Sequence, residues 1–462
     1  MKATQIVTLG LVFCAHVTTH AQGLPAPRWP GTGKVIDTVV CKTDPTQSYA
    51  LYIPVTGNSK PLPVVYFFDP HASGAFPLNK YKSLADAFGF IIIGSNNSKN
   101  GNDWPTVEKI WRCLLDDTQN RLKINPNRVY ACGFSGGAKV AGWLAMQHPV
   151  IKGVIANGAG LPDGTPARNF NFSFTAIAGE GDLNFTDLVA ISNELDKTQT
   201  RHRLVLFDGK HEWAPAGCMN TAFAGLQFDA MQQGLISRDI AFINGYVEKS
   251  KKSVENYGIA NQPVKAVGEC ALSISFLEGL TDQAGWFKAK AASLVQTAQY
   301  KEQQQARENI LVTEQNTKTG YMQHFQQADM PYWTKTINDL RAGTRAKTAQ
   351  SAMCQRLLAW LSLAFYSYSN HLLNSNANNE ARYFVALYKM ADPSNSEAWY
   401  FSAILHAREQ QAPAAENDLM KAVDYGFRDM KRLHQQPEFQ QLSGQLHFSR
   451  IENGMHAALK SK

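Results

Sequence analysis

The sequence predicts an α/β fold with an eight-stranded, mostly parallel sheet, followed by an all-helical domain. Up to about Gly217, short runs rich in β-branched residues alternate with helical runs, which is typical of a parallel sheet covered by helices on both faces. After that point β-rich runs become rare, and Gln, Ala, Asn and aromatic residues dominate. The chain has 462 residues, which is more than one core usually supports, so two domains are expected.

Eight segments of the first region have the length and composition of strands. They are residues 35–40, 49–53, 64–68, 90–94, 129–132, 154–156, 174–178 and 204–207. The last six are the more apolar, as a sheet buried on both faces requires. Helical runs lie between them, notably at 81–88, 104–122 and 138–147. This alternation predicts parallel strands joined by helices.

A serine stands between glycines where one of these strands meets a helical run. Residues 128–137 read Arg-Val-Tyr-Ala-Cys-Gly-Phe-Ser-Gly-Gly, and a helix-forming run begins at 138. In so tight a turn only glycine fits on either side of the serine, which lifts Ser135 clear of the sheet and aims the N–H of Gly136 at a reacting carbonyl. A chain of this length would contain about 0.15 Gly-x-Ser-x-Gly matches by chance. The match is informative mainly because a predicted strand precedes it and a predicted helix follows it.

Four further segments accompany this nucleophile motif. They are Phe-Phe-Asp-Pro-His-Ala-Ser-Gly at 67–74, Asn-Pro-Asn-Arg-Val-Tyr at 125–130, Gly-Glu-Gly-Asp at 179–182 and Gly-Lys-His-Glu-Trp at 209–213. With them, residues 22–236 resemble the α/β-hydrolases, most nearly the secreted esterases grouped with polyhydroxybutyrate depolymerases and feruloyl esterases. The resemblance implies that fold and the hydrolysis of an ester, polymeric and carbohydrate-linked esters included, but it does not identify the substrate.

A nucleophilic serine needs a base, and the base needs a carboxylate partner. We expect His211 to be the base, because it follows the last strand at the carboxyl edge of the sheet, whereas His202 precedes that strand and should lie at the opposite edge. Asp182 is expected to be the carboxylate, which makes the chain order Ser, Asp, His of this fold. Of the alternatives, Glu180 lies too close to the strand end, and Asp187 is expected on the next helix.

The oxyanion formed during attack needs two N–H donors. Gly136 should supply one of them. Related esterases carry His-Gly after the third strand, whereas this chain has His71-Ala72. We assign the second N–H to Ala72, although a side chain there either narrows the acyl site or shifts the donor by one residue. The His71 ring is a candidate for substrate binding, with a loop contact as the alternative.

Two tryptophans border the predicted catalytic loops. Trp104 and Trp213 are candidates for stacking on an aromatic or sugar group of the substrate, and core packing is the alternative for both. The sequence contains no His-Glu-x-x-His, no calcium loop and no Gly-x-Gly-x-x-Gly after the first strand. We therefore expect neither a metal nor another cofactor.

The first 21 residues have the pattern of a secretory signal peptide. Met1-Lys2 precede a largely apolar run at 6–17, and Thr19-His20-Ala21 suits cleavage after Ala21, so a secreted or periplasmic protein is expected. The apolar run is shorter than the roughly 20 residues that a membrane span needs. Cys14 raises the alternative of a lipoprotein, but Phe13 occupies a position that needs a small residue.

Charge and cysteine content exclude some functions. The net charge of +7 is spread along the chain, and its densest cluster, at 249–252, is flanked by Glu248 and Glu255. We interpret that cluster as a solvated helix end or linker, so no nucleic-acid partner is expected. Six cysteines would remain after removal of the signal; some of them could pair in an oxidising compartment, and the absence of Cys-x-x-Cys argues against a thiol redox function.

The expected helical domain, residues 251–462, carries a spacing typical of tetratricopeptide repeats. Ala381 and Ala415 are 34 residues apart, and so are Pro393 and Phe427, which predicts repeats over about 362–428. Helices expected at 286–311 and 353–373 would complete or cap the array. The glycine usual early in each repeat is missing, and a plain helical bundle is the alternative.

Together these patterns predict an exported serine esterase whose catalytic domain spans residues 22–250 and which works through an acyl-enzyme. A serine peptidase on the same fold is one alternative. The other alternative is an envelope binding or assembly protein that acts through its helical repeats, for which the partner would be a protein or a polymer.

Overall fold

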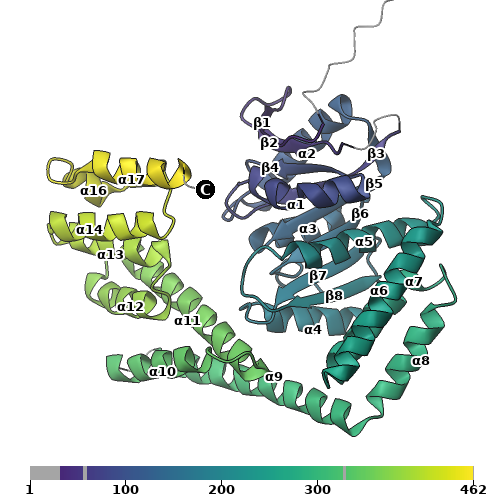
Figure 1. Cartoon of the computed structure of the whole chain (residues 1–462). Coiled ribbons are helices and arrows are strands. Elements are labelled where there is room, and N and C mark those ends of the chain that lie inside the picture. Colours follow the sequence, from purple (N-terminus) through teal and green to yellow (C-terminus); the bar gives the residue numbers. More distant parts are fainter. Residues whose placement is uncertain (1–31, 56–59, 326–328, 461–462) are drawn as a thin grey trace, which may run out of the picture.

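The computed structural model describes residues 32–55, 60–325 and 329–460. The predicted signal peptide lies outside the described residues. Two parts are visible in Figure 1: a sheet flanked by helices, and a long series of helices that runs beneath it and forms a stack on the left. None of the described helices is long and apolar enough to cross a membrane.

The sheet has eight strands, as the sequence predicts. They are β1 (Ile36–Val40), β2 (Ser48–Tyr52), β3 (Leu62–Phe68), β4 (Ile91–Ser95), β5 (Ile124–Phe134), β6 (Ile151–Asn157), β7 (Ser173–Gly179) and β8 (His202–Phe207). Their order across the sheet is β1-β2-β4-β3-β5-β6-β7-β8. β2 is antiparallel to β1 and to β4, and all other neighbours are parallel. Every predicted strand is present; the largest difference is β5, which begins five residues earlier than expected, at Ile124 rather than Val129.

Helices cover both faces of this sheet. One face packs against α2 (Trp104–Arg121), α3 (Gly136–Gln147) and α4 (Phe185–Leu195), and the other against α1 (Ala75–Phe88) and α5 (Ala216–Gln232). Alternation along β3 explains the division, because Tyr66 and Phe68 face the first layer while Val65 and Phe67 face the second. All four side chains are fully buried. The sheet is therefore apolar on both faces, as parallel strands joined by helices require.

The chain passes into its helical part without a linker at the expected domain boundary. Residues 250 and 251 lie inside α6 (Ile240–Ile259), and the basic cluster at 249–252 is part of this helix, so its interpretation as a helix end or linker was wrong. Next, α7 (Pro263–Leu277) is tied to the sheet by Arg203 of β8, which pairs with Asp229 of α5 at 2.5 Å and donates to Ser275 at 3.0 Å. The buried ion pair holds Arg203 in place between β8 and α5, and its hydrogen bond to Ser275 joins α7 to the α/β part.

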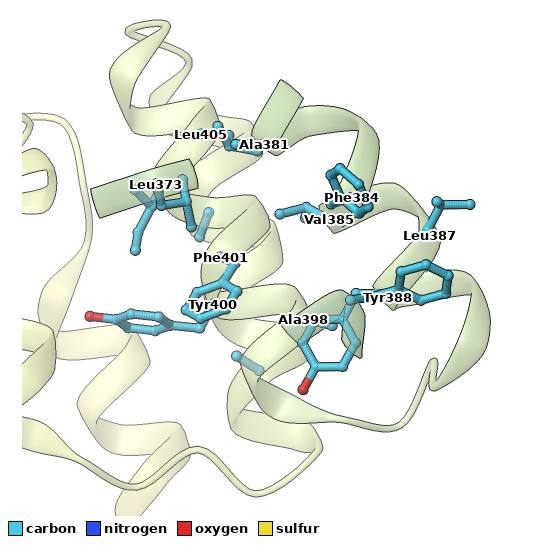
Figure 2. Close-up of a cluster of buried hydrophobic side chains, with 14 of the residues drawn as sticks. Leu373, Ala381, Phe384, Val385, Leu387, Tyr388, Ala398, Tyr400, Phe401 and Leu405 are labelled. Atoms are coloured by element: carbon cyan, nitrogen blue, oxygen red, sulfur yellow. The ribbon is translucent and has the colours of Figure 1, made fainter. Parts of the chain in front are cut away.

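The remaining helices continue as α8 (Ala284–Val295), α9 (Ala298–His324), α10 (Met330–Gly343), α11 (Ala349–Asn374), α12 (Asn378–Ala391), α13 (Ser396–Arg408), α14 (Ala412–Asp424), α15 (Met430–Gln435), α16 (Pro437–Gln441) and α17 (Phe448–Lys460). From the end of α9 onward they share one apolar core. Figure 2 shows part of it, which includes Leu373 of α11, Tyr388 of α12, and Tyr400 and Phe401 of α13.

Positions 34 residues apart occupy matching places in two helical hairpins. Ser369 of α11 and Ala403 of α13 are both fully buried, and so are Ala381 of α12 and Ala415 of α14. Small side chains at these places let the paired helices approach closely. The pairing has the form that the spacing predicts, and assignment of these hairpins to the tetratricopeptide class stays a prediction.

The cysteines among the described residues are all free thiols. Cys41 and Cys113 are buried neighbours, and burial together with a hydrogen bond between their side chains raises the pKa of Cys41 to about 12. Cys132 is also fully buried, as expected of an apolar filler within β5.

Candidate active site

The turn between β5 and α3 holds Ser135 in a conformation that few residues adopt. Its φ and ψ are 53° and −124°, and a positive φ outside glycine is usually kept only where the surroundings enforce it. A Cβ on Gly133 would lie 2.0 Å from the Gly137 carbonyl oxygen, and one on Gly137 would lie 1.9 Å from the carbonyl oxygen of Phe68. Both glycines are therefore required by the close approach of the backbone, which explains the motif in physical terms.

Substitution of Gly137 tests this explanation. The Gly137→Ala variant should lose about 3 kcal/mol of unfolding free energy, because its methyl group would meet the backbone carbonyl of Phe68. Urea unfolding of the purified variant measures the loss. Gly217→Ala is the matched control, since a Cβ there meets no atom within 4 Å and the residue lies in α5. Equal unfolding midpoints for the two variants would contradict the explanation.

Three predicted residues come together above this turn. The Nε2 of His211 lies 2.9 Å from the Oγ of Ser135, and its Nδ1 lies 2.9 Å from Oδ1 of Asp182. Asp182 is fully buried, while the His211 side chain is 25% exposed. A carboxylate can only accept from Nδ1–H, so Nε2 is left to accept the hydroxyl proton. A proton taken from the Ser135 hydroxyl by Nε2 would therefore leave a positively charged imidazolium beside the buried carboxylate of Asp182.

Glycine-rich loops bring the acid and the base together. Asp182 follows β7, and His211 follows β8, the neighbouring strand. A Cβ on Gly179 would lie 2.5 Å from the Lys210 carbonyl oxygen, so the two loops can touch only because this residue is glycine. The amide of Asn184 donates to Oδ1 of Asp182 at 2.8 Å and helps to orient the carboxylate.

Asn157 is a further polar residue of this site that the sequence motifs do not indicate. It ends β6 and is fully buried. Its backbone carbonyl accepts from the amide of Ser135 at 2.9 Å, while its side chain accepts from the amide of Ala214 at 2.7 Å and donates to the Glu212 carbonyl at 3.2 Å. One residue therefore links the serine turn to the histidine loop. A polar residue at the carboxyl end of an apolar strand was the only signal that could have indicated it.

The region expected to bind the oxyanion contains Gly136 and the 71–73 loop. Among the described residues, the Gly136 amide donates to no backbone carbonyl. The amide of Ala72, in contrast, donates to the Asp69 carbonyl at 3.2 Å, and Ala72 has a φ of 59°. Within the described part of the chain, no partner occupies the amide of Ser73. These contacts favour the alternative in which the second donor is shifted by one residue.

Asn100 is another residue near this region that the sequence did not indicate. A Cβ on Gly136 would lie 1.9 Å from Oδ1 of Asn100, so the amide side chain lies directly against this glycine. The amide of Asn100 donates to the Pro70 carbonyl at 2.9 Å, which brings its loop beside the 71–73 loop.

The two candidate tryptophans lie in different environments, because Trp213 is buried and Trp104 is partly exposed. Trp213 is 5% exposed, donates to Oδ2 of Asp69 at 2.9 Å and packs against Phe67, as the core-packing alternative expects. A role of Trp213 in substrate binding stays a prediction. Trp104 is 40% exposed and stacks on Trp143 with ring centroids 5.0 Å apart. A flat, partly exposed aromatic pair is suited to ring stacking, so Trp104 stays a candidate and Trp143 joins it.

His71 lies at the surface of its loop. Its side chain is 79% exposed, and its amide donates to Oδ1 of Asp69 at 2.9 Å. Hydrogen bonding to the Asp69 carboxylate raises the pKa of the His71 ring. These contacts agree with the alternative of a loop contact, and a role of His71 in substrate binding stays a prediction.

The rival histidine and carboxylates have other positions. His202 begins β8 and has Nε2 3.1 Å from Oδ1 of Asp196. Asp187 lies in the first turn of α4, as the sequence predicts. The described residues contain no group of three or more His, Cys, Asp or Glu side chains arranged to hold a metal ion.

Comparison with known proteins finds similarity only at the level of structure. No protein-family model and no curated protein sequence matches the chain. The fluorophosphonate-binding serine hydrolase F of Staphylococcus aureus is 12% identical over 42% of this chain and 99% of its own, with a TM-score of 0.36. An esterase from the archaeon Pyrobaculum calidifontis is 13% identical over 43% of this chain and 87% of its own, with a TM-score of 0.36. A ferulic acid esterase is 14% identical over 41% and 94%, with a TM-score of 0.32.

The order and direction of the eight strands, with helices on both faces, decide the fold. This chain has the α/β-hydrolase fold. Likenesses at such low identity and TM-score say nothing about the function of a chain with this fold. Function depends on the side chains at the carboxyl edge of the sheet.

Proposed function

We propose that this protein is a serine hydrolase that cleaves carboxylic esters through an acyl-enzyme. The observation that carries the proposal is the continuous hydrogen-bonded series from the Oγ of Ser135 through the His211 ring to the buried carboxylate of Asp182, with both steps at 2.9 Å. A hydroxyl is a poor nucleophile at neutral pH, and a neutral imidazole that accepts its proton during attack removes that difficulty.

The reaction proceeds in two halves. Oγ of Ser135 attacks the ester carbonyl while Nε2 of His211 accepts its proton, and Asp182 stabilises the imidazolium that forms. His211 then returns the proton to the leaving alcohol, and the acyl group stays on Ser135. In the second half, water gives its proton to Nε2 and attacks the acyl carbonyl. Return of that proton to Oγ releases the acid and restores the enzyme.

The tetrahedral intermediates carry their negative charge beside the start of α3. The amide of Gly136 supplies one hydrogen bond to this oxyanion, and the positive end of the helix adds a favourable field. The second donor comes from the 71–73 loop. Ser73 is the better choice because Ala72 already donates to the Asp69 carbonyl at 3.2 Å. Loss of one such donor typically costs about 10² to 10³ in rate.

The leaving group or the acyl group of the substrate is proposed to stack on the ring of Trp104. Its stacking on Trp143 holds the ring in one orientation, and 40% of Trp104 remains exposed. Esters are preferred over amides because of the resemblance to secreted esterases carried by segments 67–74, 125–130, 179–182 and 209–213. Aromatic and carbohydrate-linked esters fit such a ring.

Export and the helical repeats complete the proposal. The signal pattern of residues 1–21 supports secretion or a periplasmic location, where the substrate would be an external ester or polymer. The helical hairpins from α11 to α14 would then present a protein or polymer partner to the catalytic site.

The test is hydrolysis of p-nitrophenyl esters from acetate to long chains, beside a chromogenic peptide, by the purified mature protein. Labelling with a fluorophosphonate probe reports the reactive serine independently of substrate choice. We expect ester turnover and a labelled Ser135. Faster cleavage of the peptide than of every ester would favour the peptidase alternative, and absence of both turnover and labelling would favour the binding alternative.

A further inference from the structure

Helix α11 reaches the loop that carries Asp182. Its lower end in Figure 1 lies beside the end of the sheet that bears α4, and the contacts identify the residues involved. A Cβ on Gly181 would lie 2.2 Å from Oε1 and 3.2 Å from Cβ of Gln355, so the helix approaches the backbone of this loop closely. In the next position, Nη1 of Arg356 donates to the carbonyl of Glu180 at 2.6 Å. The helical part of the chain therefore contacts the loop of the proposed catalytic carboxylate directly.

The guanidinium of Arg356 joins three elements. Its Nε and Nη2 pair with the carboxylate of Glu314 in α9 at 2.7 and 2.6 Å. Its central carbon lies 4.7 Å from the ring centroid of Phe185, the first residue of α4. The Arg356 side chain is 3% exposed and that of Glu314 is fully buried. Both nitrogens contact Oε2 of Glu314, while Oε1 lies 2.8 Å from Nζ of Lys318. Such a buried pair has a defined geometry, because the guanidinium is planar and its N–H groups have fixed directions.

These contacts lie on both sides of Asp182 in the chain. The carbonyl of Glu180 is two residues before it, and the ring of Phe185 is three residues after it. The same loop is also bound to the histidine loop, since the amide of Gly181 donates to the Gly209 carbonyl at 2.8 Å. The Asp182 loop is thus held between α11 and the loop that carries His211.

A pocket of about 380 Å³ lies beside this contact, between α4, α9 and α11, and Asn184, Lys318 and Trp360 are among its lining residues. The side chains of Arg356 and Glu314 are themselves buried. Hydrogen bonds to a charged donor are strong where water is excluded, so the polar contacts of Arg356 restrain the loop.

We propose that Arg356 is a positioning residue through which the helical region holds Asp182 in line with His211. The inference rests on the proposed function, since Asp182 matters to the rate only if His211 is the base. The rival interpretation is purely structural: the loop is held by its own bonds, such as that from Asn184 Nδ2 to the Gly158 carbonyl at 2.7 Å, and Arg356 only stabilises the fold.

Ester-hydrolysis kinetics of Arg356 variants, made in the wild-type protein and in the Asp182→Asn variant, distinguish these interpretations. We expect Arg356→Met to lower kcat for a p-nitrophenyl ester about 10- to 100-fold with KM within about threefold, because a shift of about 1 Å in a positioning group can cost 10²-fold. Arg356→Lys, which keeps the positive charge beside Glu314, should recover part of the loss. In an Asp182→Asn background, Arg356→Met should change kcat by less than about twofold, because coupled residues are not additive.

The matched control is Arg408→Met. Arg408 is also a largely buried arginine, but it pairs with Glu438 and donates to Asn378 and to the Leu373 carbonyl, all within the helical region. It should lower the urea unfolding midpoint without changing kcat. If Arg356→Met proves too unstable to purify, Arg356→Lys decides the question in the same two backgrounds.

Three results would overturn the inference. The first is an active wild-type protein whose kcat is unchanged by a folded Arg356 variant. The second is a loss that multiplies fully in the Asp182→Asn background, because the effect would then not pass through the carboxylate. The third is a wild-type protein that neither hydrolyses esters nor reacts with the fluorophosphonate probe, which would overturn the proposed function and this inference with it.

Discussion

The Ser135→Ala variant is expected to lose at least about 10⁴ of kcat for a p-nitrophenyl ester while it keeps its fold. Removal of the nucleophile closes the acyl-enzyme route, and only binding and the oxyanion donors remain to accelerate the reaction. The fold should persist because, among the described residues, the Ser135 side chain hydrogen-bonds only to Nε2 of His211, at 2.9 Å. Alanine also keeps the backbone amide that donates to the Asn157 carbonyl at 2.9 Å.

Initial rates and urea unfolding on the same preparations provide the measurement. Ser253→Ala is a suitable control, since its hydroxyl donates only to the Lys249 carbonyl on an exposed part of α6. The control should have wild-type kcat, and the Ser135 variant should no longer react with a fluorophosphonate probe. Retention of more than about a hundredth of the wild-type kcat would rule out an obligatory acyl-enzyme on Ser135.

Asp182→Asn should reduce kcat about 10⁴-fold with little change in structure. The amide has nearly the shape of the carboxylate. Oδ1 of Asp182 accepts from the amide of Asn184 at 2.8 Å and lies 2.9 Å from Nδ1 of His211, so an NH₂ group in that place gives up the bond from Asn184. What changes is the proton on the histidine. An amide NH₂ beside Nδ1 favours the tautomer with the proton on Nε2, and that nitrogen can no longer accept from the Ser135 hydroxyl. The buried negative charge that stabilises the imidazolium is lost as well.

Asp187→Asn is the matched control for this experiment. Asp187 is the nearby carboxylate on α4, in the same first turn that follows the Asp182 loop, and its pKa is raised by burial. Its substitution should change kcat by less than about threefold. A larger loss in Asp187→Asn than in Asp182→Asn would show that the wrong carboxylate has been assigned. Comparable losses in both variants would argue for a shared structural role instead.

The features that the sequence predicted share a local cause. The serine turn could be located because neighbouring backbone leaves no room for a Cβ at residues 133 and 137. Both positions must therefore be glycine, and glycine at this spacing around a serine can be recognised in the sequence. Asp182 and His211 could be proposed because each follows an apolar strand in a glycine-rich loop. Strands of one parallel sheet bring their carboxyl ends to one edge, so strand order alone predicts that these loops meet.

The residues that the sequence did not reveal depend on contacts between distant segments. Asn157 is a plain polar residue at a strand end, and only the folded chain places its side chain on the histidine loop. Trp213 lies two residues after His211, where a substrate-binding residue could equally be expected. Its ring N–H instead donates to Asp69, which lies 144 positions away in the chain. Arg356 is one arginine on a long helix, and 176 residues separate it from the carbonyl that it binds.

The sequence by itself thus determined the α/β class, the eight strands, the serine turn and the candidate acid and base, because short-range backbone geometry and strand periodicity govern each of these. Only the tertiary structure decided that the chain continues through α6 without a linker, that Trp213 belongs to the core and that α11 reaches the Asp182 loop. Those outcomes depend on which distant surfaces are buried against one another. Burial is a property of the whole packed chain, and no local pattern of residues encodes it.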